Sequence, residues 1–205
     1  MSQANLDFIQ TPSPRIASQI VVIGASHGGI QALMVLIAML PSDFPAAIVV
    51  VQHIAAHRPS LLAHVLSYHT GICVQQVAGG ESLQGGQVYV APPDRHVLVN
   101  AGGVLSLSDA PKDTYSRPAI NLLFESAATS YGARATAVVL TGANSDGARG
   151  VRAIKEGGGY VFAQDKSTAD CYFMPRAAID TGCVDAVLPL PEIASFLVQR
   201  HNKIK

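Results

Sequence analysis

Three side chains with complementary chemistry follow three hydrophobic runs of this sequence. Ser26 follows "VVIGA", His53 follows "AIVVVQ", and Asp146 lies in "ANSDG" just after "AVVLTG". A serine hydroxyl is a weak nucleophile, an imidazole can remove its proton near neutral pH, and a buried carboxylate can orient the imidazole and stabilise its charged form. These residue types predict the nucleophile, general base and orienting acid of a serine hydrolase, provided that the fold brings them together.

Each of these residues also has a simpler explanation when it is taken alone. The pattern Gly-x-Ser-x-Gly in "GASHG" is common by chance, and a glycine-rich turn between a strand and a helix often binds phosphate. His53 fits a hydrogen-bonded histidine at a strand end, and Asp146 before Gly147 fits a turn residue or a helix cap. Catalysis is favoured because all three are expected at one edge of a sheet, where the backbone N–H of His27, at the head of the next helix, could stabilise an oxyanion.

The spacing of apolar residues predicts strands that alternate with helices. The predicted strands are "VVI", "AIVVVQ", "ATAVVLTG", "YVFAQ" and "VDAVLPL", and the predicted helices cover 30–40, "PSLLAHVLSYHTG", 118–131, a stretch ending at Ile154, and two stretches that begin near Pro175 and at Pro191. Between the helix "PSLLAHVLSYHTG" and the helix 118–131, the sequence has three short alternating runs, "ICVQQV", "GQVYVAPP" and "HVLVNAGGVLSLS", and "NAGG" predicts a hairpin turn.

This alternation predicts an α/β fold with a doubly wound, mostly parallel sheet, helices on both faces and a small antiparallel hairpin insert. The carboxyl ends of parallel strands share one edge of a sheet, so Ser26, His53 and Asp146 can meet there. We expect Ser26 Oγ to lie near one ring nitrogen of His53 and the Asp146 carboxylate near the other.

Composition excludes several classes of function. The chain has 205 residues, 49% of them hydrophobic, which is enough for one sizeable core and short for two domains. Lys plus Arg (14) balance Asp plus Glu (14), so nucleic-acid binding is not expected. The apolar stretch 32–40 ends at Pro41, well short of the roughly 20 residues that span a bilayer, and the N-terminus lacks a signal-peptide pattern. A soluble, cytoplasmic protein without membrane insertion is expected.

Other candidate sites are weaker. The three cysteines are widely spaced, which fits reduced thiols better than disulfides or a zinc site. His53 and His57 have a spacing that could bind a metal on a helix, but "IAA" between them supplies no glutamate base. Asp94, Arg95 and His96 in "APPDRH" fit a salt-bridged turn.

Six motifs in order resemble those of one protein family. They are "IGASHGG", "VVVQHI", "VYVAPPDRH", "SRPAINLLFESAA", "VVLTGANSDGARG" and "AQDKSTADCYFMPRAAIDTG". Together, from about Ile20 to about Leu190, they resemble the catalytic domain of the CheB-type chemotaxis protein-glutamate methylesterases. The serine, histidine and aspartate of that family fall on Ser26, His53 and Asp146.

The resemblance implies hydrolysis of γ-glutamyl methyl esters on cytoplasmic helices of chemoreceptors through an acyl-serine, often with deamidation of receptor glutamines, and it implies no cofactor. It also makes Ala143 a backbone oxyanion donor and suggests Ser116 and Arg117 as substrate-binding residues, although these two alone fit a region that precedes a helix. The sequence departs from the family pattern at His27 (usually threonine), Ser116 (commonly histidine) and Ala143 (methionine).

The resemblance further predicts a domain organisation. Residues 1–18 are expected to be a flexible lead-in and 19–205 a methylesterase-like catalytic domain without a receiver domain, because 18 residues are too few for one. The chain would then be a stand-alone esterase or an excised fragment, of unknown oligomeric state. The alternatives are a non-catalytic binding module of the same fold in a chemosensory complex and, less well supported, a phosphate-binding protein that uses the 24–29 turn.

Overall fold

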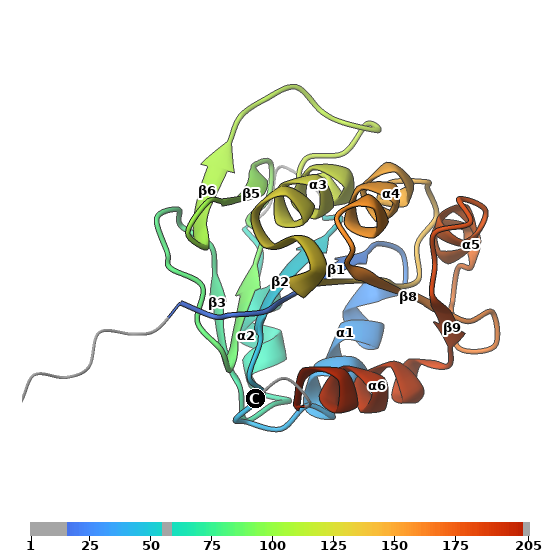
Figure 1. Cartoon of the computed structure of the whole chain (residues 1–205), viewed down its shortest axis with the longest axis horizontal. Coiled ribbons are helices and arrows are strands. Elements are labelled where there is room, and N and C mark those ends of the chain that lie inside the picture. Colours follow the sequence, from blue (N-terminus) through green and yellow to red (C-terminus); the bar gives the residue numbers. More distant parts are fainter. Residues whose placement is uncertain (1–15, 55–58, 203–205) are drawn as a thin grey trace, which may run out of the picture.

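A parallel β-sheet forms the centre of the molecule (Figure 1). The computed structural model describes residues 16–54 and 59–202. Its main strands are β1 (Ile20–Ala25), β2 (Ala47–Gln52), β3 (Cys73–Gln76), β4 (Gln87–Val90), β7 (Ala135–Val139), β8 (Tyr160–Gln164) and β9 (Ala186–Leu188). They pair in the order β3-β4-β2-β1-β7-β8-β9, and every pair is parallel. The predicted doubly wound α/β fold is confirmed.

In the described part of the chain six α-helices cover both faces of this sheet, and the central strands β1, β2 and β7 are buried along their whole length. The helices are α1 (Gly29–Ala38), α2 (Leu62–Ser67), α3 (Ile120–Tyr131), α4 (Ala148–Glu156), α5 (Phe173–Ile179) and α6 (Leu190–Asn202). Within β1, Val21 and Ile23 belong to the core layer formed with α1, α2 and α6, whereas Ile20 and Val22 belong to the layer formed with α3, α4 and α5. Burial of each such side chain contributes about 1.5–3 kcal/mol relative to its exposure.

The predicted small antiparallel hairpin insert is confirmed. It consists of β5 (His96–Asn100) and β6 (Val104–Ser108), which the predicted "NAGG" turn joins. The runs that contain β3 and β4 belong to the parallel sheet. The hairpin is fixed to α3, because Val99 N–H donates to Ser126 Oγ at 3.0 Å and Ser130 Oγ donates to Val99 O at 2.8 Å.

The ends of several elements differ slightly from their predicted positions. Of the expected lead-in 1–18, residues 1–15 lie outside the described residues, while Ala17 is buried and its N–H donates to Leu83 O at 2.8 Å. Helix α5 begins at Phe173, so Pro175 lies in its first turn, where proline is tolerated. No helix in the described part of the chain is both long and apolar enough to cross a membrane.

The order of the strands creates a switch point at the carboxyl end of the sheet, where open α/β folds form their ligand-binding crevice. The chain leaves β1 for α1 on one face and leaves the adjacent strand β7 for α4 on the opposite face. At such a switch point the two loops diverge, and ligands of open α/β sheets bind there. Ser26 and Asp146 belong to these two loops.

Candidate active site

Ser26 lies in the turn between β1 and α1, with its backbone fixed from both neighbouring strands. Ser26 N–H donates to Thr141 O, after β7, at 3.0 Å, and Ser26 O accepts Gln52 Nε2, from β2, at 2.8 Å. Gly28, with φ of 76°, is the N-cap of α1 and lets the chain turn sharply into the helix. The side chain of Ser26 is therefore held at the crevice on a rigid support.

His53 lies beside Ser26 because of strand register. In the β1–β2 ladder Ala25 is the partner of Gln52, and His53 N–H continues the ladder by donating to Ala25 O at 3.0 Å. The next residues along the two strands, Ser26 and His53, are thus neighbours at the sheet edge. The imidazole is 13% exposed, which leaves it accessible from the crevice.

The Asp146 carboxylate binds the imidazole and the N-terminus of α3 at the same time. Asp146 Oδ2 lies 2.8 Å from His53 Nε2 and also accepts Ile120 N–H at 2.7 Å, while Oδ1 accepts Asn121 N–H at 3.0 Å. The first N–H groups of a helix lack partners within the helix, and its N-terminus attracts negative charge. Helix α3 has no side-chain cap of its own, so the buried Asp146 supplies one.

A glycine in β1 allows α3 to approach close enough for this arrangement. A Cβ atom on Gly24 would lie 2.4 Å from Ile120 Cγ2, a distance that no real contact has. Any side chain at position 24 would therefore push the first turn of α3 away from the sheet. Gly24, two residues before Ser26, thus helps to place Asp146, because the Ile120 N–H at the start of α3 donates to the Asp146 carboxylate.

Asn144 contacts the second ring nitrogen of His53 and was not predicted from the sequence. Its Oδ1 accepts Asp146 N–H at 3.1 Å, which identifies the atom that faces the imidazole as the amide nitrogen, Nδ2. Nδ2 lies 3.3 Å from His53 Nδ1. Among the described residues Ser26 Oγ makes no hydrogen bond, so the amide of Asn144, rather than the Ser26 hydroxyl, occupies this position.

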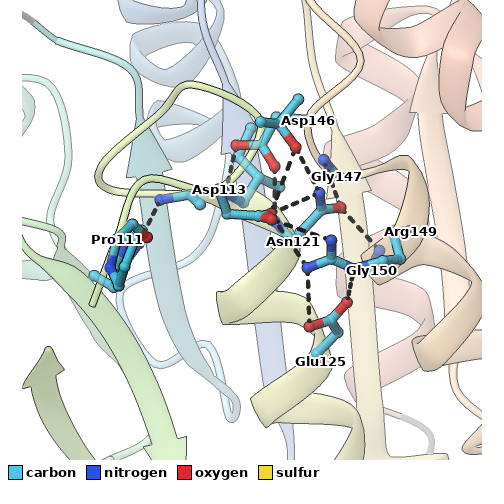
Figure 2. Close-up of polar contacts among 12 residues, drawn as sticks. Pro111, Asp113, Asn121, Glu125, Asp146, Gly147, Arg149 and Gly150 are labelled. Atoms are coloured by element: carbon cyan, nitrogen blue, oxygen red, sulfur yellow. Dashed lines mark hydrogen bonds and ion pairs between the residues drawn. The ribbon is translucent and has the colours of Figure 1, made fainter. Parts of the chain in front are cut away.

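A second amide, Asn121, joins the loops around the site (Figure 2). Its Oδ1 accepts the N–H groups of Gly147 and Gly150, both at 3.0 Å, and its Nδ2 donates to Asp113 Oδ2 at 3.0 Å. Asp113 also pairs with Arg149, which pairs with Glu125. A signal for Asn121 exists in the sequence only as a polar residue on the buried face of an apolar helix.

The charges in this network are well compensated. Burial raises the pKa of Asp113, but hydrogen bonds from Asn121 and Arg149 outweigh burial, so that the pKa lies below its ordinary value. Hydrogen bonds to Glu125 and Asp113 raise the pKa of Arg149. Asp113 and Arg149 therefore remain charged near neutral pH and fix the loop before α3 against α4.

The two predicted oxyanion donors lie in the loops that border the crevice. His27 follows Ser26 and is exposed, and its carbonyl accepts Thr141 Oγ1 at 2.8 Å. Ala143 is exposed in the loop after β7. This loop lies close to Ser26, because a Cβ atom on Gly142 would be only 2.9 Å from Ser26 Cβ. In the described part of the chain the N–H groups of His27 and Ala143 donate to no protein acceptor, so both are available to a ligand.

Ser116 and Arg117 line a small cavity next to His53. The cavity measures about 140 Å³. Its other lining residues are His53, Ile54, Lys112, Tyr115 and Pro118. Arg117 is anchored by Asp94, 2.8 Å away, and Ser116 belongs to a tight turn rather than to the helix N-cap, which is Ala119. Both are thus placed where a substrate could reach them.

The competing sites remain less well supported. Asp94 pairs with Arg117 and Arg95 with Asp109, as a salt-bridged turn predicts. His57 lies outside the described residues. Within 16–54 and 59–202, no group of three or more His, Cys, Asp or Glu side chains is arranged to hold a metal ion.

Comparison with known proteins gives the family. The sequence model of the family described as CheB methylesterase matches residues 21–197. This chain belongs to the CheB methylesterase family. A protein-glutamate methylesterase/protein-glutamine glutaminase 2 of Anaeromyxobacter dehalogenans is 46% identical over 186 residues, and a putative protein-glutamate methylesterase/protein-glutamine glutaminase of Leptospira interrogans is 41% identical over 179 residues. The crystal structure of the Thermotoga maritima CheB methylesterase catalytic domain has a TM-score of 0.86 and 38% identity, and the match covers 89% of this chain and 98% of that one.

CheB methylesterase relatives differ in how much of their length this chain spans. The match covers 91% of this chain but 54% of the Anaeromyxobacter protein. It covers 87% of this chain and 93% of the Leptospira protein. The chain therefore spans about half of the longer relative and almost all of the shorter one.

Proposed function

We propose that the chain is a serine hydrolase that removes methyl groups from γ-glutamyl methyl esters of a protein. The proposal is carried by the 2.8 Å contact between His53 Nε2 and the buried Asp146 carboxylate, with His53 opposite Ser26 just beyond the end of the strand ladder. Membership of the CheB methylesterase family, and relatives named protein-glutamate methylesterase/protein-glutamine glutaminase, support the same reaction.

In the proposed mechanism Ser26 is the nucleophile and His53 the general base. Asp146 accepts a hydrogen bond from Nε2–H, so the lone pair of the neutral imidazole is on Nδ1. Once the Asn144 amide leaves Nδ1, Ser26 Oγ attacks the ester carbon as its proton passes to Nδ1, and the carbonyl electron pair moves to the oxygen. The N–H groups of His27 and Ala143 stabilise this oxyanion.

Collapse of the tetrahedral intermediate releases the methyl group. The carbon–oxygen bond to the methoxy group breaks, and the leaving oxygen takes the proton from Nδ1 to give methanol and an acyl-Ser26. Water then attacks the acyl group with His53 again as base, and glutamate and free Ser26 are released. With a glutamine side chain the same steps release ammonia, so deamidation is the companion reaction.

The protein substrate that we propose is the cytoplasmic part of a methyl-accepting chemoreceptor, with Ser116 and Arg117 near the bound segment. Tyr115, which borders the small cavity beside His53, is exposed and available for contact with a protein substrate. The test is methanol release from a methylated receptor cytoplasmic fragment, with ammonia release from its glutamine form measured in parallel. Methanol release is expected with the purified chain, whereas binding of the fragment without either product would favour the binding-module function.

A further inference from the structure

A strained turn lies beside the candidate active site. Asp113 and Ser116 close it with two backbone hydrogen bonds, of 3.2 Å from Asp113 N–H and 2.8 Å from Ser116 N–H. The central residues, Thr114 and Tyr115, have φ of 47° and 65°. Positive φ at both central positions is typical of a type I′ turn, in which glycine, asparagine and aspartate are preferred. A β-branched residue and a large aromatic residue are strained there.

Polar contacts to the neighbouring helices hold the turn in this conformation. Asn121 Nδ2 donates to Asp113 Oδ2 at 3.0 Å and to Thr114 Oγ1 at 3.2 Å, and Arg149 pairs with the Asp113 carboxylate at 3.1 Å. Asn121 is itself buried, and its own N–H donates to Asp146. The turn therefore has a fixed position relative to the Asp146 and His53 side chains.

In the described part of the chain, the Tyr115 side chain makes no contact that would offset the backbone strain. The residue is 96% exposed, and within the described residues its hydroxyl makes no hydrogen bond. It lines the cavity of about 140 Å³ to which His53 also contributes. A strained backbone that presents an aromatic ring to solvent next to a reactive histidine indicates a role in contact with another molecule.

We propose that Tyr115 is a specificity-determining residue that packs against the protein segment carrying the esterified glutamate. This inference rests on the proposed function, because a segment whose ester reaches Ser26 and His53 must pass the cavity beside them. A tyrosine ring offers a large rigid apolar surface with few torsions to immobilise, which suits the aliphatic side of a helical segment. A small ester has no such segment to pack against the ring.

The test compares Tyr115→Gly and Tyr115→Phe on two substrates. One is a methylated receptor cytoplasmic fragment and the other is p-nitrophenyl acetate. Loss of one aromatic contact is expected to lower kcat/KM of Tyr115→Gly for the protein by about 5- to 30-fold, mainly through KM, with the small ester unchanged within about twofold. Tyr115→Phe keeps the ring and should retain the activity of the original chain on both substrates.

The thermal stability of Tyr115→Gly separates a substrate-binding role from a structural one, because loss of a structural side chain would lower Tm. Glycine relieves the positive φ at position 115, so Tyr115→Gly should have an unchanged Tm or one higher by about 1–4 °C. Unchanged kcat/KM for the protein, or equal losses on both substrates, would overturn the inference. Failure of the unsubstituted chain on both substrates would instead contradict the proposed function.

Discussion

Asp146 and His53 are separated by 93 positions in the chain, and yet Oδ2 of the first lies 2.8 Å from Nε2 of the second. The same oxygen accepts Ile120 N–H at 2.7 Å, so the carboxylate is held by a helix N-terminus as well as by the imidazole. This double contact fixes the direction of the carboxylate, so catalysis should depend on the charge and geometry of Asp146.

Asp146→Asn keeps the shape of the side chain but removes its charge and one acceptor. If the amide oxygen stays on Asn121 N–H, the NH₂ group replaces Oδ2, faces His53 Nε2 and favours the wrong tautomer. Methanol release should then fall roughly 10³- to 10⁴-fold in kcat with little change in KM. Asp180→Asn, on an exposed carboxylate, is the matched control. A loss of less than about tenfold would argue against the role of Asp146.

Asn144→Ser tests whether the amide on Nδ1 restrains the base. Serine can still accept Asp146 N–H through its hydroxyl but is too short to reach His53. A neutral hydrogen bond contributes about 0.5–1.5 kcal/mol, so its loss should speed the reaction of Ser26 with a fluorophosphonate by about 2- to 10-fold. The rate is followed by intact mass, with Asn100→Ser on the exposed hairpin as control. An unchanged or slower reaction would show that Asn144 does not compete with Ser26.

His201 should make folding stability depend on pH. Burial, with a smaller contribution from the charge of Arg200, lowers its pKa from 6.5 to about 4. Between these values the unfolded chain binds a proton that the folded chain does not, so this stability is complete above about pH 6.5 and is lost as the pH falls towards about 4, to a total of about 3 kcal/mol.

The measurement is urea unfolding of the chain and of His201→Gln at pH 7 and pH 4.5. The variant lacks the titrating group. Its free energy of unfolding should therefore decrease less from pH 7 to pH 4.5 than that of the original chain, by a difference of about 2–3 kcal/mol. His64→Gln, on the exposed His64, should lose as much as the original chain. Equal losses in His201→Gln and the original chain would contradict the assignment.

Much of the fold could be predicted because its strands are continuous apolar runs. Strands β2 and β8 have the bounds expected from "AIVVVQ" and "YVFAQ". Because parallel strand ends share one edge of the sheet, the predicted proximity of His53 and Asp146 is also found. Strands β3 and β4 were harder to assign, because a short alternating run does not reveal whether its partner is parallel or antiparallel.

The finer arrangement of the site could not be predicted for a physical reason. The contact between Asn144 and Nδ1 depends on the path of one loop after β7, and the position of Asp146 depends on how closely Ile120 approaches Gly24. Both are distances between segments remote in sequence, which residue types and local spacing do not encode. Likewise, nothing in "KDTYSRP" by itself indicates positive φ at Tyr115.

The central claim, that Ser26 attacks a γ-glutamyl methyl ester, is tested most directly by methanol release from a methylated receptor fragment with the original chain, Ser26→Ala and the control Ser195→Ala. Loss of the nucleophile should lower kcat roughly 10³- to 10⁶-fold in Ser26→Ala, with an unchanged circular dichroism spectrum and unfolding midpoint, while Ser195→Ala keeps full activity. Methanol release by a folded Ser26→Ala variant within tenfold of the original rate would contradict the account.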